Sequence, residues 1–103
     1  MRQLYKLYYK YLELFPKKDK FALGAKCENY IITVLELLLS ASSANKEEKA
    51  TIVKRTSIKF DTLKAMLRIT RELDIIDAKK YINLQKQLFE IGRQLGGWQK
   101  SLM

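Results

Sequence analysis

The clearest helical pattern in the chain is Tyr81-Ile-Asn-Leu-Gln-Lys-Gln-Leu-Phe-Glu-Ile-Gly-Arg-Gln-Leu-Gly-Gly-Trp98. Apolar residues recur along it at steps of three and four, at Tyr81, Leu84, Leu88, Ile91, Leu95 and Trp98. Because an α-helix completes a turn every 3.6 residues, these side chains share one face. The stretch therefore predicts an amphipathic helix over about residues 77–98, with Asp77 as its N-cap.

The two segments before it have the same periodicity. A coiled-coil-like seam predicts a helix over about residues 18–42, and it consists of Leu23, Cys27, Tyr30, Val34, Leu37 and Ala41. A second seam, with Phe60, Leu63, Leu67 and Thr70, predicts a helix over about residues 46–73. Asn45 and Glu48 resemble a capping box at its start, although the β-branched residues between 51 and 58 lower helix propensity there.

The first segment, about residues 1–15, has its charges on one stripe and is apolar over more than half of its circumference. The stripe consists of Arg2, Lys6, Lys10 and Glu13. Pro16 ends this helix, because a proline disfavours helical geometry at the residue before it. Four helices joined by short connections predict an all-α fold, an antiparallel up-down-up-down bundle that forms a single domain over residues 1–103.

The charge balance favours an anionic partner. The 20 Lys and Arg residues exceed the 11 Asp and Glu residues, which gives a formal net charge of +9. Such an excess attracts polyanions, so nucleic acid is the expected partner class. No apolar run reaches the ~20 residues of a membrane span, and the N-terminal segment mixes basic residues into its apolar run, unlike a signal peptide. We therefore expect a soluble cytoplasmic protein.

The sequence offers little for catalysis. It has no histidine, which removes the commonest general base and the commonest metal ligand. Its single cysteine, Cys27, lies on an apolar seam and is expected to be a buried hydrophobe. The glycine-rich stretch Gly92–Gly97 lacks the Lys-Ser/Thr of a phosphate-binding loop. We predict a protein that is not an enzyme, with no metal, cofactor or small-molecule substrate.

Basic residues form the candidate binding site. Lys64, Arg68 and Arg71 are four and three residues apart, so they share a stripe beside the apolar face of the third helix. We expect this stripe to face outward and to contact RNA or a protein. Further basic candidates are Lys17, Lys18, Lys20 and Lys26 after the first helix, and Arg93 in the fourth.

The glycines of the last helix have two interpretations. Gly92 and Gly96 are four residues apart, so they can let another backbone approach closely. Alternatively, Gly96 and Gly97 simply end the helix. The apolar surface of the first two helices exceeds what a monomeric bundle of this size can bury, which favours self-association.

Two stretches resemble the signature sequences of a known family. Phe15-Pro-Lys-Lys-Asp-Lys-Phe-Ala-Leu-Gly24 and Glu90-Ile-Gly-Arg-Gln-Leu-Gly-Gly-Trp98 are similar to those of bundle proteins related to the accessory variability determinant (Avd) of diversity-generating retroelements. The basic helix Leu63–Leu73 resembles the third helix of that family. Within these stretches, we expect packing roles for Phe15, Pro16, Gly24, Gly92, Gly96, Gly97 and Trp98.

The resemblance implies a function that composition does not. Avd proteins form basic, barrel-like homopentamers, bind the retroelement's reverse transcriptase and its template RNA, and support mutagenic synthesis of complementary DNA. By this resemblance, the basic positions of the family correspond to Lys64, Arg68 and Arg93, and Arg71 extends the stripe. Two alternatives remain: a bundle protein of the kind encoded in intervening sequences of ribosomal RNA genes, and a general nucleic-acid-binding protein.

Overall fold

A computed structural model describes residues 1–102 and contains only helices and their connections over that range. In chain order the elements are α1 (Arg2–Leu12), α2 (Lys17–Asp19), the π-helical turn η1 (Lys20–Gly24), α3 (Ala25–Ser42), α4 (Lys46–Glu72) and α5 (Ala78–Ser101). The prediction of an all-α four-helix bundle is confirmed.

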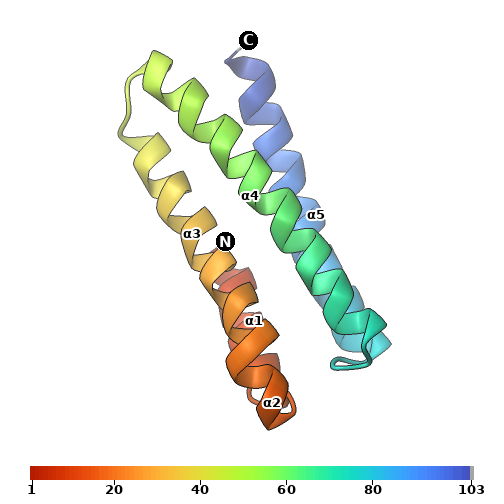
Figure 1. The fold of residues 1–103 in the computed structure, drawn as a ribbon. Coiled ribbons are helices and arrows are strands. Elements are labelled where there is room, and N and C mark those ends of the chain that lie inside the picture. Colours follow the sequence, from red (N-terminus) through yellow and green to blue (C-terminus); the bar gives the residue numbers. More distant parts are fainter. Residues whose placement is uncertain (103) are drawn as a thin grey trace.

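The three long helices α3, α4 and α5 follow one another through short turns at alternating ends of the molecule (Figure 1). Helix α4 packs against both α3 and α5, and α1 packs against the same two helices. The bundle is elongated, with extents of 43 × 22 × 19 Å. Because α1 has only 11 residues, it accompanies α3 over part of its length, and its N-terminus lies near the middle of the bundle (Figure 1).

Seam residues from every main helix form the core. The fully buried side chains include Leu4, Tyr8, Cys27, Ile31, Val34, Leu63, Leu67 and Leu84. Two buried threonines of α4 satisfy their hydroxyls locally, since Thr56 donates to the Ile52 carbonyl and Thr70 to the Leu67 carbonyl. Both buried threonine hydroxyls are therefore paired within α4 itself.

The N-terminal part differs from the predicted helices over about residues 1–15 and 18–42. Helix α1 ends at Leu12, and Phe15 is held by a turn in which its N–H donates to the Leu12 carbonyl at 3.1 Å. Pro16 then precedes the first residue of α2, where its missing N–H costs nothing. Helical structure thus resumes at Lys17, one residue earlier than expected, and passes through the π-helical turn before α3 begins.

The caps of α4 and α5 agree with the sequence analysis. The Asn45 side chain accepts a hydrogen bond from the Glu48 N–H at 2.8 Å, and Asp77 does the same for the Lys80 N–H at 2.8 Å. Helix α4 is continuous from Lys46 despite its β-branched start, because tertiary packing outweighs weak local propensity. None of the helices within residues 1–102 combines the length and apolar character that crossing a bilayer requires.

Candidate functional site

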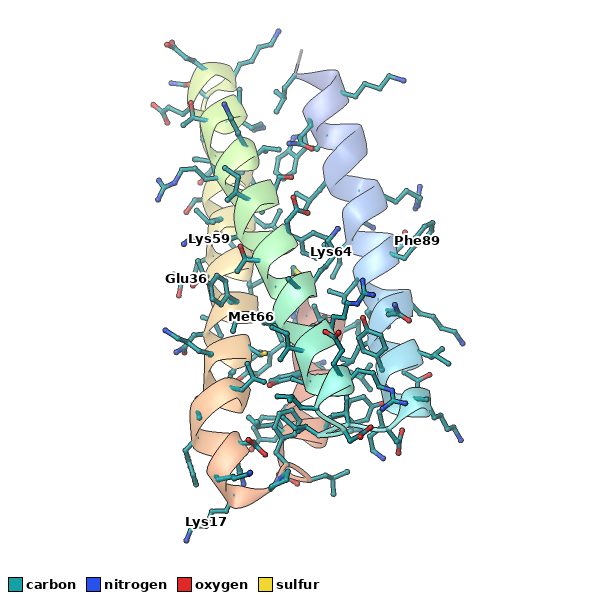
Figure 2. The ribbon with its side chains drawn as sticks, turned by 45° about the vertical axis from the view of Figure 1, so that its right-hand side comes forward. Lys17, Glu36, Lys59, Lys64, Met66 and Phe89 are labelled. Atoms are coloured by element: carbon teal, nitrogen blue, oxygen red, sulfur yellow. The ribbon has the colours of Figure 1, made fainter. Side chains whose placement is uncertain are left out.

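A groove between α4 and α5 brings together several of the predicted site residues. It encloses about 600 Å³ and is lined by Lys64 from α4 and by Tyr81, Gln85, Leu88, Phe89, Gly92 and Arg93 from α5. Figure 2 shows Lys64 beside α5 and Phe89 pointing outward from α5. The groove therefore has an apolar floor with one basic residue from each helix, which suits a partner that is both anionic and apolar.

Phe89 is the residue of this groove that sequence reasoning missed. Its side chain is 74% exposed, although phenylalanine is usually buried. In sequence it is adjacent to the seam residue Leu88, which places it about 100° away from the core-facing direction. A large apolar residue at such a position is a signal of a contact surface, and the helical wheel of α5 contains that signal.

The predicted basic stripe of α4 is present but partly neutralised. Lys64 forms an ion pair with Asp61 at 3.3 Å, and Arg71 forms one with Asp74 at 2.8 Å. Arg68 is exposed and has no acidic side chain within 4.0 Å among residues 1–102. Because exposed ion pairs are weak, a polyanion can compete with Asp61 for Lys64 and with Asp74 for Arg71. Arg68 can bind a polyanion without first breaking an ion pair.

Arg93 lies on the α5 side of the groove and is paired with Glu90. The hydrogen bond from Arg93 lowers the pKa of the Glu90 carboxyl, which shows that the carboxylate is stabilised by this pair. A phosphate that approaches Arg93 must therefore either displace the Glu90 carboxylate or share the guanidinium with it. Arg93 contributes less attraction than an unpaired arginine would.

The four lysines predicted near the first turn form a separate basic region. Lys17 and Lys18 are exposed on α2, Lys20 is half-buried in the π-helical turn and Lys26 is exposed on α3. In Figure 2, Lys17 points away from the end of the bundle, far from Lys64 and Phe89. Of the predicted basic residues, Lys64 and Arg93 therefore line the α4–α5 groove, Arg68 and Arg71 continue the stripe of α4 outside its lining, and the four lysines lie toward the α2 end.

The first signature stretch holds a crowded contact. Phe15 is buried and packs edge-on against Tyr8, with ring centroids 5.9 Å apart. Gly24 is buried beside it, and a Cβ there would lie 2.6 Å from Cδ1 of Leu12. The Tyr8 hydroxyl donates to the Gly24 carbonyl at 2.8 Å. Pro16 is exposed, so its role in this stretch is to set the direction of the backbone between α1 and α2 and not to fill the core.

The second signature stretch is open by comparison. A Cβ on Gly92 would make an ordinary contact of 3.5 Å with Phe60, and a Cβ on Gly96 or Gly97 would meet nothing within 4 Å. Helix α5 continues to Ser101, so the interpretation that Gly96 and Gly97 end it is wrong. A packing role for these two glycines therefore requires another molecule.

Trp98 is partly buried near the end of α5. Together with Met1, Leu38, Ile91, Gln94 and Leu95 it lines a small cavity of about 110 Å³. The ammonium of Lys49 lies 5.8 Å from the ring centroid, within cation–π range. Trp98 thus joins the start of α4 to the end of α5.

The thiol of Cys27 is inaccessible to solvent. Cys27 is fully buried, and burial raises the pKa of its thiol to about 11. It is therefore protonated at neutral pH and a poor nucleophile. Among residues 1–102, no three Cys, Asp or Glu side chains come together as a metal site would need.

The fold and this surface define a class of protein, a small basic four-helix bundle with a groove suited to binding. The model of the bAvd-like family matches residues 1–102, and the chain belongs to that family. The resemblance to Avd proteins is thereby confirmed. No curated protein sequence matches the chain significantly.

Proposed function

We propose that the protein is a non-catalytic accessory subunit of a diversity-generating retroelement, which binds the element's reverse transcriptase and template RNA as a homopentamer. The observation that carries the proposal is the family match, which extends over all four helices of the bundle. Accessory proteins of this type supply binding surfaces and leave the chemistry to the polymerase.

The charge distribution supports an RNA-binding role. Only four of the 20 Lys and Arg side chains form an ion pair within 4.0 Å among residues 1–102. The others are free to neutralise phosphates, and each phosphate neutralised releases counterions. RNA binding should therefore weaken steeply with salt.

The α4–α5 groove is the proposed contact surface for the polymerase or for RNA. Its apolar floor and exposed Phe89 suit a protein contact, and its Lys64 and Arg93, with Arg68 one turn along α4 from Lys64, suit an acidic or phosphate-bearing partner. Exposed aromatic and arginine side chains are the residue types that dominate binding energy at interfaces.

A triple variant with Lys64, Arg68 and Arg71 changed to glutamine tests this surface. It should stay folded, because these side chains are exposed or half-exposed and their ion pairs add little stability. If the stripe contacts RNA, the slope of log affinity against log salt should fall by roughly one unit for each phosphate that the variant no longer neutralises. If it contacts the polymerase, RNA binding should survive while co-purification with the reverse transcriptase fails.

The matched control removes three exposed lysines of α5 instead, namely Lys79, Lys86 and Lys100. Both variants remove the same charge, so an equal effect of the two would show general electrostatic attraction and no defined site. If the triple variant of Lys64, Arg68 and Arg71 is folded and binds RNA and the polymerase normally, the proposal that this stripe contacts a partner is contradicted.

The pentamer is tested by light scattering at micromolar concentration. One chain has a mass of 12.1 kDa, so the assembly should have about five times that mass. A single-chain mass would refute the oligomer, and purified protein with intrinsic polymerase or nuclease turnover would refute the accessory role.

A further inference from the structure

The outer face of α1 holds a pair of tyrosines beside a row of basic residues. Tyr5 and Tyr9 are four residues apart, and Lys6 and Lys10 follow each of them directly. These four side chains, with Glu13, line a shallow hollow on the surface of the bundle. Tyr9 is 54% exposed, so its ring is open to solvent.

Tyr5 and Tyr9 form a neighbouring aromatic pair on this face. Their ring centroids are 6.4 Å apart and the ring planes are 31° from parallel. Because Tyr9 is exposed, its ring can receive the flat face of a nucleic-acid base.

Tyr5 is the fixed member of this aromatic pair. Its hydroxyl donates to Oε2 of Glu28 on α3 at 3.1 Å, and the side chain is half-buried against the core. The hydrogen bond also raises the pKa of Tyr5. An anchored ring beside Tyr9 loses little freedom when a base stacks there.

The basic row supplies charge along the strand direction. Arg2, Lys6 and Lys10 succeed one another at four-residue steps, which places them on one stripe about 6 Å apart along the axis. All three are exposed, and none has an acidic side chain within 4.0 Å among residues 1–102. They are therefore less neutralised than the α4 stripe.

We propose that the outer face of α1 binds single-stranded RNA, with one base stacked on Tyr9 beside Tyr5 and neighbouring phosphates on Lys6 and Lys10. The inference rests on the proposed RNA-binding function and assigns it a site. A single strand is required because a base paired and stacked in a duplex cannot stack on Tyr9. Stacking on aromatic side chains beside a basic track is the usual means by which proteins hold single strands.

Glu13 gives the proposal an opposite-sign test. It lines the same hollow one turn beyond Tyr9 and is exposed. Its negative charge repels phosphate, so Glu13→Gln should tighten binding of the strand while Lys10→Gln weakens it. A surface that served only as a structural face of the bundle would show neither change.

The central experiment compares Tyr9→Ala with Tyr9→Phe by fluorescence anisotropy. The probes are a labelled single-stranded RNA, the same strand annealed to its complement, and an abasic strand of equal length. Tyr9→Ala should weaken binding of the single strand at least about fivefold, because a stacked base contributes about that much or more. It should change binding of the duplex and of the abasic strand little, whereas Tyr9→Phe, which retains the ring, should bind as the wild type does.

Leu14→Ala is the matched control, since Leu14 is an exposed apolar residue, 66% exposed, just beyond the end of α1 and outside the hollow. Wild-type protein that binds no RNA would refute the proposed function itself. Wild-type binding that Tyr9→Ala leaves unchanged would refute only the α1 site. A fall in oligomer mass for Tyr9→Ala in light scattering would overturn the proposal in favour of a contact between copies of the chain.

Discussion

Replacing Gly24 by alanine should destabilise the protein, whereas the same replacement at Gly96 should stabilise the subunit. Both glycines are helical, so each alanine gains about 1 kcal/mol of helix propensity. The two glycines differ in the atoms that surround them. At Gly24 a Cβ would lie 2.6 Å from Cδ1 of Leu12 and 3.1 Å from the backbone oxygen of Asp19, whereas at Gly96 it would meet nothing within 4 Å.

The size of the effect follows from that crowding. The Leu12 side chain can move, but the Asp19 oxygen belongs to the backbone at the end of α2, directly before the π-helical turn, and cannot move without disturbing that turn. Overpacking of this kind costs about 1–3 kcal/mol, which outweighs the gain in propensity. We therefore expect Gly24→Ala to lose about 1 kcal/mol and Gly96→Ala to gain about 1 kcal/mol.

Urea denaturation followed by circular dichroism measures both variants against the wild type. Protein concentration must be equal throughout, because assembly raises apparent stability. The two midpoints should move in opposite directions without a change in the slope m. A Gly24→Ala variant at least as stable as Gly96→Ala would contradict the crowding at Gly24. If Gly96→Ala raises subunit stability but reduces the mass measured by light scattering, Gly96 lies at a contact between subunits.

Three further predictions concern the caps and the buried thiol. Asn45→Ala should lower the free energy of unfolding by about 1 kcal/mol, because it removes the acceptor for the Glu48 N–H, and thermal denaturation measures the change. Cys27 should resist iodoacetamide at pH 8 in the folded protein and react once urea unfolds it, since burial raises its pKa to about 11; rapid labelling of the native state would contradict its burial. Hydrogen bonds from the Lys80 side chain and N–H lower the pKa of Asp77 in the folded state, so its carboxylate stabilises the fold above the ordinary pKa of 3.8 and loses this effect as pH falls below that value. Asp77→Asn keeps a capping side chain, so its stability relative to wild type should be lowest at neutral pH and should recover on acidification, as urea titrations across that range will show.

Part of the candidate site was accessible from the sequence. The basic stripe of Lys64, Arg68 and Arg71 follows from helical spacing, and their exposure follows from their distance to the apolar seam. The ion-pair partners could also be predicted from the sequence, since Asp61 and Asp74 each lie three residues from the cation with which they pair. The groove could not be predicted from the sequence, because it depends on how α4 and α5 are placed relative to each other.

The boundaries of the first helices show a different limit. Pro16 correctly indicated an interruption, but α1 ends before it, at Leu12, because the chain must turn there for Phe15 to reach the core beside Tyr8. A local rule places a break near a proline and does not say which residues on either side are needed for packing. The π-helical turn before α3 likewise brings the Gly24 carbonyl to the Tyr8 hydroxyl, a contact between residues 16 positions apart.

Residue type and spacing alone were enough to predict the helical class, the four helices, the caps at Asn45 and Asp77, the buried face of each helix and the absence of histidine chemistry. Each of these depends on residue type and on spacing within one helix, and periodicity records both. The tertiary structure alone decided which glycine is crowded, that Phe89 faces a groove beside Lys64, and how Glu28 anchors Tyr5. Those properties are distances between residues on different helices, and only the packing of the bundle sets them.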